Sequence, residues 1–187
     1  MLSGSLLGYL FFVTLLPLSS LGAGVLKNVT IGSDNPSVLF SAGWSSALRE
    51  GDVSEVVSSD RYGDWVELVL PVSTVAVYYV GFTQPDGALY AACVDCEEPW
   101  GRFMRVDAFD PHENDTPVTL LAFTGLDPER SHVLDVMNVR DPRFGYAGQI
   151  TFAGAIVTVL EDDVISKWDN ELSTASLALA SAVKLTA

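Results

Sequence analysis

The sequence has 187 residues, with 24 acidic and 10 basic side chains that give a formal net charge of −14. A chain of this length forms a single domain around one hydrophobic core. Its negative charge repels nucleic-acid phosphates and anionic lipid headgroups, so neither is an expected partner.

Residues 1–24 have the features of a secretory signal peptide. An uncharged apolar run extends from Leu6 to Leu18, and small residues follow it through Gly24. The run is shorter than the roughly 20 residues that a membrane-spanning helix needs. The sequence therefore predicts a secreted, extracellular protein. The alternative is a retained segment, or a lipid anchor in the tail, that holds the protein at the cell surface.

The next part of the chain predicts three short strands. Ser37–Ser41 is the first, and Trp44 follows it in a loop. We expect Trp44 to cap the edge of the core, and the alternative is that it stacks on a ligand. Apolar residues within 53–57 predict an edge strand. Trp65–Leu70 alternates between apolar and polar residues, which is typical of a half-exposed strand.

The segment from Val75 to Val94 predicts a hairpin. Val75–Val80 is apolar on both faces of an extended chain, which favours a central strand. Gln84–Gly87 contains the Pro, Asp and Gly of a tight reversal. We therefore expect Leu89–Val94 to return antiparallel beside Val75–Phe82.

Cys93 and Cys96 form a C-V-D-C pair at the end of that strand. In an oxidising compartment this spacing favours a disulfide that closes a short loop and fixes local geometry. Zinc binding together with His112 and His132 is the sharper alternative, although the histidine spacing matches no standard module. A redox-active pair is disfavoured because its first cysteine would need a helix N-terminus.

The second half of the chain predicts four more strands: Phe103–Phe109, Val118–Phe123, His132–Val139 and Gln149–Leu160. Short strands with turn signals between them indicate an all-β fold, an antiparallel β-sandwich or jelly roll of about eight or nine strands. We assign this domain to residues 25–162. Residues 163–187 predict a weakly ordered or marginally helical tail.

Two sequons, at Asn28 and Asn114, predict glycosylation. Four acidic residues surround the second sequon: Asp107, Asp110, Glu113 and Asp115. Their oxygens could hold Ca²⁺, but they lack the spacing of a calcium-binding loop. An ordinary solvated loop is therefore favoured, and we expect no metal site or cofactor.

The sequence contains no arrangement of residues that predicts catalysis. Only His112 and His132 could serve as the base of a Ser-His-Asp triad, and no G-x-S-x-G motif accompanies them. We expect each histidine to be a surface residue or a hydrogen-bonded structural one. Pairs of carboxylates, which glycoside cleavage uses, are no evidence for it here, because a chain with 24 acidic residues always contains some pair that looks suitable. The chain is therefore not expected to be an enzyme.

Several motifs stand in a distinctive order: VAVYYVG, LYAACVDC, RVDAFD, PVTLLAFTGLDPERSHVLDVMN, DPRF and ITFAGAIVTV. In this order, from Asn28 to Glu161, the chain resembles a group of fungal, mainly basidiomycete, secreted or single-pass proteins. Their extracellular region is similar to a galactose-binding-domain-like β-sandwich. The resemblance implies a jelly-roll module of a kind often used for carbohydrate recognition, and it brings no catalytic or binding residues.

Carbohydrate binding would use aromatic faces against the apolar side of a sugar ring. Four aromatic residues on predicted loops are candidates: Tyr62, Trp100, Phe144 and Tyr146. The sequence thus favours a secreted, non-catalytic module that binds carbohydrate or cell-wall polysaccharide. The alternative is a membrane-associated extracellular domain that contacts other proteins in a structural or sensing role.

Overall fold

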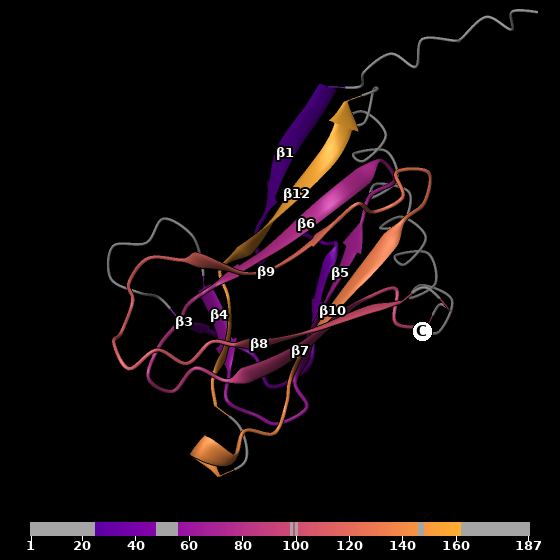
Figure 1. Ribbon diagram of the computed structural model, residues 1–187. Helices are drawn as coiled ribbons and strands as arrows, with labels where there is room; N and C mark the ends of the chain where they lie inside the picture. Colours follow the sequence, from indigo (N-terminus) through magenta and orange to yellow (C-terminus); the bar gives the residue numbers. More distant parts are fainter. Residues whose placement is uncertain (1–24, 48–55, 98, 100, 146–147, 162–187) are drawn as a thin grey trace, which may run out of the picture.

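The computed structural model describes residues 25–47, 56–97, 99, 101–145 and 148–161 (Figure 1). The predicted signal peptide, residues 1–24, and the predicted tail, residues 163–187, lie outside the described residues. The described part of the chain contains twelve strands and one short 3₁₀ helix, and none of its helices is long and apolar enough to cross a membrane.

The strands form three antiparallel sheets. The four-stranded sheet has the order β1 (Val25–Ile31), β12 (Gly154–Glu161), β6 (Thr74–Gly81) and β9 (Val118–Thr124). The five-stranded sheet has the order β2 (Val38–Phe40), β5 (Trp65–Leu70), β10 (His132–Asn138), β7 (Leu89–Val94) and β8 (Arg102–Asp107). The three-stranded sheet has the order β11 (Ile150–Phe152), β4 (Val56–Ser59) and β3 (Ser45–Ala47), and the 3₁₀ helix η1 (Pro142–Phe144) follows β10.

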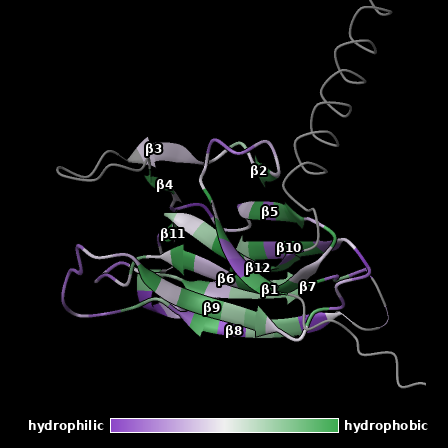
Figure 2. Cartoon of the chain, turned by 90° about the horizontal axis from the view of Figure 1, so that it is seen from above, coloured by the Kyte–Doolittle hydropathy of each residue, from purple (hydrophilic) through white to green (hydrophobic). Residues whose placement is uncertain are grey.

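The core brings together apolar side chains from all three sheets, and hydrophobic residues dominate the strands that surround it (Figure 2). In β5, Val66, Leu68 and Leu70 are fully buried, whereas the residues between them are at least partly exposed, as the alternating sequence predicts. Tyr79 of β6 and Tyr90 of β7 pack edge to face with ring centroids 6.3 Å apart. The predicted all-β, antiparallel sandwich is therefore confirmed.

The two core tyrosines keep their hydroxyl groups hydrogen-bonded. Tyr79 Oη donates to the carbonyl oxygen of Thr151 at 2.7 Å, and the backbone N–H of Thr151 donates to Tyr90 Oη at 3.0 Å. Burial raises the pKa of Tyr90 to about 12 and also raises the pKa of Tyr79 well above its ordinary value. Both hydroxyls are therefore neutral, and the core holds polar atoms without an unpaired charge.

The chain between β6 and β7 crosses from one sheet to the other, so the predicted hairpin is wrong. β6 pairs with β12 and β9, whereas β7 pairs with β10 and β8. The turn at Gln84–Gly87 is present, but other segments hold it: Gln84 N donates to Ala108 O at 3.1 Å, and Ala88 N donates to Gln149 O at 3.0 Å. A turn sequence reverses the chain without choosing a partner, because any neighbouring strand can satisfy the backbone groups.

The described chain has twelve strands, where about eight or nine were expected, because β1 and β3 were not predicted and one predicted strand divides in two. The strand predicted at an edge near Val56 is buried, since β4 lies between β11 and β3. β1 was not predicted, and most of its residues are exposed. The predicted strand Gln149–Leu160 divides at Gly154, whose φ of 145° suits glycine and lets the chain pass from β11 into another sheet.

Trp44 closes one edge of the core, as the sequence predicts. Its ring centroid is 4.9 Å from that of Phe40, and its Nε1 donates to the carbonyl oxygen of Trp65 at 2.9 Å. The same carbonyl accepts a bond from the backbone N–H of Ser41 at 3.0 Å. Trp44 therefore joins the loop after β2 to the first residue of β5.

Candidate functional site

Two of the four loop aromatic residues selected from the sequence are described. Tyr62 lies on the turn before β5 and is 60% exposed. Phe144 lies in η1, with its ring centroid 6.4 Å from that of Phe109. Trp100 and Tyr146 lie outside the described residues. The ligand surface predicted on these loops therefore stays a prediction.

Arg143 ties η1 to the end of β8. Its guanidinium donates to both carboxylate oxygens of Asp107, at 2.7 and 3.0 Å, and to Asp141 at 2.6 Å. These charge-assisted bonds lower the pKa of Asp107 and of Asp141. The guanidinium carbon also lies 4.9 Å from the ring centroid of Phe109 and 5.6 Å from that of Phe144. Phe144 is thus part of a structural cluster.

The acidic loop considered for calcium uses its carboxylates within the protein. Asp107 is paired with Arg143, and Asp110 Oδ1 accepts the backbone N–H of His112 at 2.9 Å. The other two residues of that set, Glu113 and Asp115, lie in the same exposed connection. Within the described part of the chain, no group of three or more His, Cys, Asp or Glu side chains is placed to hold a metal ion.

The two predicted glycosylation sites both lie at the surface. Asn28 is exposed on β1, and its Oδ1 accepts the hydroxyl of Thr158 at 2.8 Å. Asn114 lies between β8 and β9, where its Oδ1 accepts the backbone N–H of Thr116 at 3.1 Å. Attachment of a glycan at either position stays a prediction.

Cys93 and Cys96 are joined by a disulfide, with their Cα atoms 5.5 Å apart, so the sulfurs proposed as zinc ligands are not free. Of the two residues between them, Asp95 has a φ of 55°, which lies in the left-handed region that aspartate tolerates better than most residues. The four-residue loop therefore fixes the position from which the Asp95 side chain extends.

Asp95 organises a buried polar cluster at the start of β10. Its Oδ2 lies 2.7 Å from His132 Nδ1, and its Oδ1 accepts the backbone N–H of Val133 at 3.0 Å. His132 is only 2% exposed, and its Nε2 lies 2.9 Å from the carbonyl oxygen of Asp127. Arg130 bridges Asp127 at 3.3 Å and Asp95 at 3.7 Å. This confirms that His132 is a hydrogen-bonded structural residue, while His112 is exposed in a loop.

The outward face of the five-stranded sheet carries the candidate site. The pairing of the strands places one residue from each in a row across this face: Leu39, Glu67, Asp135, Cys93 and Phe103. The neighbouring row contains Trp65, Met137, Ala91 and Arg105. These residues share a face because side chains alternate along a strand, and their partners on the other side, such as Val66 and Leu134, are in the core.

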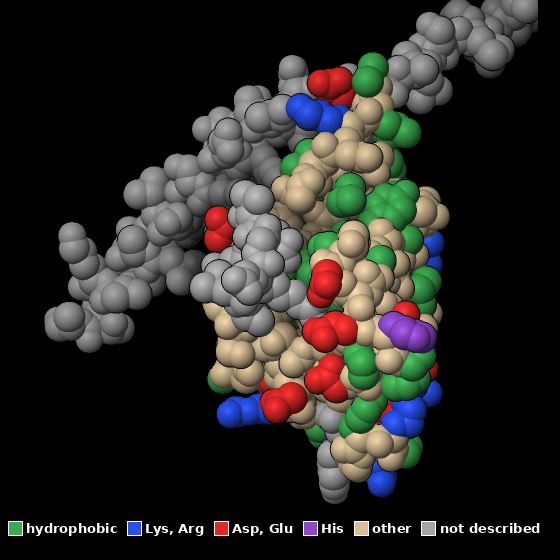
Figure 3. Space-filling model, turned by 90° about the vertical axis from the view of Figure 1, so that its left-hand side faces the viewer, with side chains coloured by type: hydrophobic (Ala, Val, Ile, Leu, Met, Phe, Trp, Pro, Cys, Tyr) green, Lys and Arg blue, Asp and Glu red, His purple; other side chains and the backbone are tan. Residues whose placement is uncertain are grey.

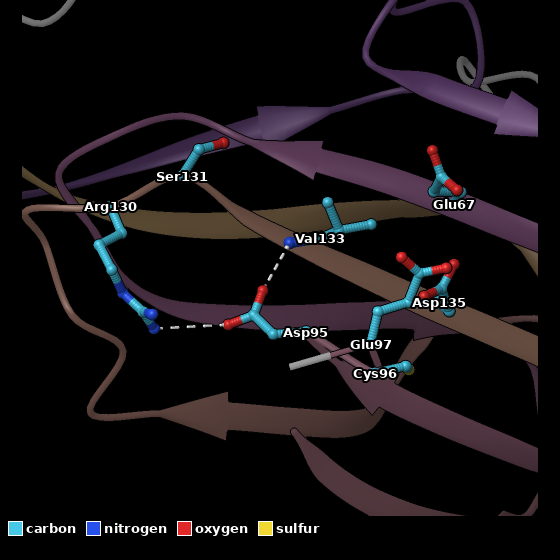
Figure 4. Close-up of a pocket in the computed structure, with 8 residues that line it drawn as sticks. All are labelled: Glu67, Asp95, Cys96, Glu97, Arg130, Ser131, Val133 and Asp135. Atoms are coloured by element: carbon cyan, nitrogen blue, oxygen red, sulfur yellow. Dashed lines mark hydrogen bonds and ion pairs between the residues drawn. The ribbon is translucent and has the colours of Figure 1, made fainter. Parts of the chain in front are cut away.

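Two adjoining hollows on this face form what we call the sheet groove. One measures 530 Å³ and is lined by Glu67, Asp95, Cys96, Glu97, Arg130, Ser131, Val133 and Asp135 (Figure 4). The other measures 480 Å³ and is lined by Trp65, Glu67, Ala91, Ala92, Cys93, Cys96, Phe103, Asp135 and Met137. Glu67, Asp135 and Cys96 belong to both hollows, so the groove runs continuously from an acidic end to an aromatic end.

The aromatic end offers apolar surface to solvent. Phe103 is 76% exposed on the edge strand β8, and Met137 is 43% exposed on β10. Trp65, at the start of β5, is partly exposed and lines the same hollow. Aromatic side chains on a β-sheet can stack against a ring of a ligand, because the strands and the neighbouring side chains hold them in place.

The middle of the sheet groove is negatively charged. Glu67 and Asp135 lie directly opposite each other in the β5–β10 pair, where facing side chains repel if their charges are alike. Partial burial raises the pKa of Asp135, and the nearby carboxylates of Glu67 and Glu97 raise it further. The groove therefore suits neutral or cationic ligands. Acidic side chains also gather on the side of the molecule shown in Figure 3, in keeping with the net charge of −14.

We expect Asp135→Asn to stabilise the fold by about 0.5 kcal/mol at neutral pH, because it removes one of two facing like charges. A carboxylate whose pKa is raised by folding imposes a penalty above that pKa, and the penalty is lost as the pH falls through it. The gain should therefore shrink in acid. Urea unfolding of both proteins at neutral and acidic pH measures the difference, and an equal gain at both would contradict this account.

The sequence analysis placed Trp65, Glu67, Phe103, Asp135 and Met137 in strands and did not select them for ligand contact. A signal was present, because Glu67 and Asp135 stand on the polar side of alternating strands. The partners of each strand were unknown, so the two carboxylates could not be placed side by side. The analysis favoured loops because binding residues often lie there.

Neither a scan of family models nor a search of curated proteins finds a match. Among solved structures, a two-domain esterase (CEX) active on acetylated mannans aligns with a TM-score of 0.50 and 15% identity, over 72% of this chain and 37% of that one. A family two carbohydrate esterase from Cellvibrio japonicus aligns with a TM-score of 0.47 and 12% identity, over 72% and 34% of the two chains. TmCBM61 in complex with beta-1,4-galactotriose aligns with a TM-score of 0.37 and 14% identity, over 73% and 88%. The chain thus spans little more than a third of each esterase, and what it shares with the first is the fold.

Proposed function

We propose that this chain is a non-catalytic β-sandwich module that binds carbohydrate in the sheet groove. One observation supports this most strongly: Trp65 and Phe103 line the hollow that also contains the Glu67 and Asp135 carboxylates. Aromatic faces pack against the apolar side of a pyranose ring, and carboxylates accept hydrogen bonds from its hydroxyl groups. The groove is open along the sheet, which suits a segment of a chain better than a single small molecule.

We further propose that the module works outside the cell, on cell-wall or other extracellular polysaccharide. The predicted signal peptide supports this placement, and so does the Cys93–Cys96 disulfide, because such bonds persist in oxidising compartments. The proposal includes no catalysis, since the buried His132 is held by Asp95 and by the carbonyl oxygen of Asp127 rather than facing a nucleophile.

Phe103→Ala should weaken binding to an insoluble polysaccharide by about tenfold, the loss expected when one aromatic stacking contact is removed. The fold should be little affected, because Phe103 lies on an edge strand and is mostly exposed. The measurement is a pull-down of the full chain on chitin, β-glucan and cellulose, with binding isotherms for the polysaccharide that retains it.

Tyr62→Ala is the matched control, since it removes an exposed aromatic side chain that is not among the residues lining the sheet groove. Equal binding by wild type and Tyr62→Ala, with weaker binding by Phe103→Ala, places the ligand on the sheet. The opposite order would move the site to the loops.

Protein contact is the second candidate function for this face. The observation that favours it is that Leu39 and Val69 are exposed on the same face of the sheet as Phe103 and Met137. Exposed apolar side chains on one face are a common feature of protein interaction sites. If no polysaccharide retains the wild-type protein, this second function becomes the better account of the sheet groove.

A further inference from the structure

The facing carboxylates of the sheet groove bring two like charges together across one strand pair. Glu67 and Asp135 are directly opposed, and among the described residues neither forms an ion pair or accepts a side-chain hydrogen bond. Glu97 lies near enough to add to the repulsion on Asp135. Two acidic side chains held face to face cost stability, so a bound cation would relieve a repulsion that the folded protein maintains.

Among the described residues that line the groove, Arg130 is the one with a basic side chain. It lies at the acidic end, where it bridges Asp95 and Asp127. Asp95 in turn holds His132 and the backbone of Val133. These contacts balance the charge of Asp95 and leave Glu67, Glu97 and Asp135 as the uncompensated charges of the groove.

We propose that the sheet groove selects glycans made of amino sugars whose ammonium groups are free, such as the glucosamine units of deacetylated chitin. This inference rests on the proposed carbohydrate function and names the class of sugar. An ammonium group has three donors and one charge, and it can lie between the carboxylates of Glu67 and Asp135 while its ring packs on Trp65, two residues along β5 from Glu67. The same aromatic faces attract a cation directly.

The composition of the groove separates this ligand from two others. A metal ion is disfavoured, since no group of three or more metal-ligating side chains comes together in the described part of the chain. Polysaccharides that carry uronic acids or sulfate are disfavoured by the uncompensated carboxylates and by the net charge of −14. An amino sugar carries a positive charge, which matches the acidic part of the groove, and an apolar ring face, which matches its aromatic end.

The test is isothermal titration calorimetry of the full chain with oligomers of equal length built from glucosamine, N-acetylglucosamine or galacturonic acid. The pH is one at which the sugar amine is protonated and the carboxylates are ionised. We expect the glucosamine oligomer to bind at least about tenfold more tightly than the acetylated one. The preference should fall with added salt, because partly exposed charges are screened.

Glu67→Gln and Asp135→Asn should each remove most of this preference, because they weaken binding of the glucosamine oligomer far more than binding of the acetylated one. Asp60→Asn is the control, since it makes the same charge change at an exposed residue outside the groove. Thermal unfolding of each variant confirms that it is folded.

The possible outcomes separate the two proposals. If acetylated and free amino sugars bind equally and the two groove variants change nothing, the inference is overturned and the carbohydrate function stands. If none of the three oligomers binds but β-glucan or cellulose retains the protein in the pull-down, the inference is overturned and the carbohydrate function stands. If neither assay shows binding, both fail. Binding of a lysine-rich peptide in the same assay would then assign the groove to protein contact.

Discussion

Gly87→Ala should destabilise the fold by about 3 kcal/mol or more, because it places a methyl group where there is no room. A Cβ at this position would lie 2.1 Å from the carbonyl oxygen of Ala108 and 2.6 Å from its carbonyl carbon, both of which belong to the backbone. Gly87 lies in the crossover between β6 and β7. In this crossover the backbone N–H of Gln84 donates to Ala108, and that of Ala88 donates to Gln149. Relieving the clash would separate these segments.

Urea unfolding measures the change, and Gly63→Ala is the matched control. Gly63 has a φ of 84° but would place its Cβ in open space, so its replacement should cost only the backbone strain of about 1–2 kcal/mol. Gly87 has no such φ, and its cost is steric. If the two variants lost the same stability, the close approach of Gly87 to Ala108 would be refuted.

Asp95→Ala should lower stability by about 3 kcal/mol, because it removes the partner of a buried histidine. His132 and the backbone N–H of Val133 would both lose an acceptor, and alanine would also have to adopt the left-handed backbone of this position. For a domain of this size the melting temperature should fall by about 10 °C. Differential scanning calorimetry gives the value directly.

Asp95→Asn separates the two causes of this loss. Asparagine accepts the left-handed conformation and can still accept the Val133 N–H, but it carries no charge to pair with His132 or Arg130. We therefore expect a loss about half that of Asp95→Ala. A loss as large as that of alanine would mean that the charge of Asp95 accounts for the whole effect, and no loss in either variant would rule out the cluster as a source of stability.

Substitution of an acidic residue of the sheet groove should change stability in the opposite direction from substitution of Asp95. Asp135→Asn should gain stability and lose the preference for amino sugars, whereas Asp95→Ala should lose stability. Residues that destabilise a fold are often retained for a function that needs them. The opposed pair Glu67 and Asp135 fits this pattern, while the cluster around Asp95 is an ordinary structural element.

Strand identity and side-chain direction followed from local sequence. The alternation of Trp65–Leu70 predicted which residues of β5 face the core, because a strand exposes every second side chain. The burial of Val77 in β6 followed from an apolar run in the same way. The cysteine spacing, together with the oxidising compartment expected of a secreted protein, also predicted the disulfide between Cys93 and Cys96.

The partners of each strand could only come from the tertiary structure. The turn at Gln84–Gly87 predicted a hairpin, yet β7 pairs with β10 and β8 in the five-stranded sheet, whereas β6 belongs to the four-stranded sheet. Glu67 and Asp135 meet through pairing between segments 68 residues apart, and Phe103 joins them through β8. Backbone hydrogen bonds are the same for every sequence, so the choice of partner is made by how all the side chains pack together. The sequence by itself determined the fold class and the faces of its strands, and packing decided which side chains share the sheet groove.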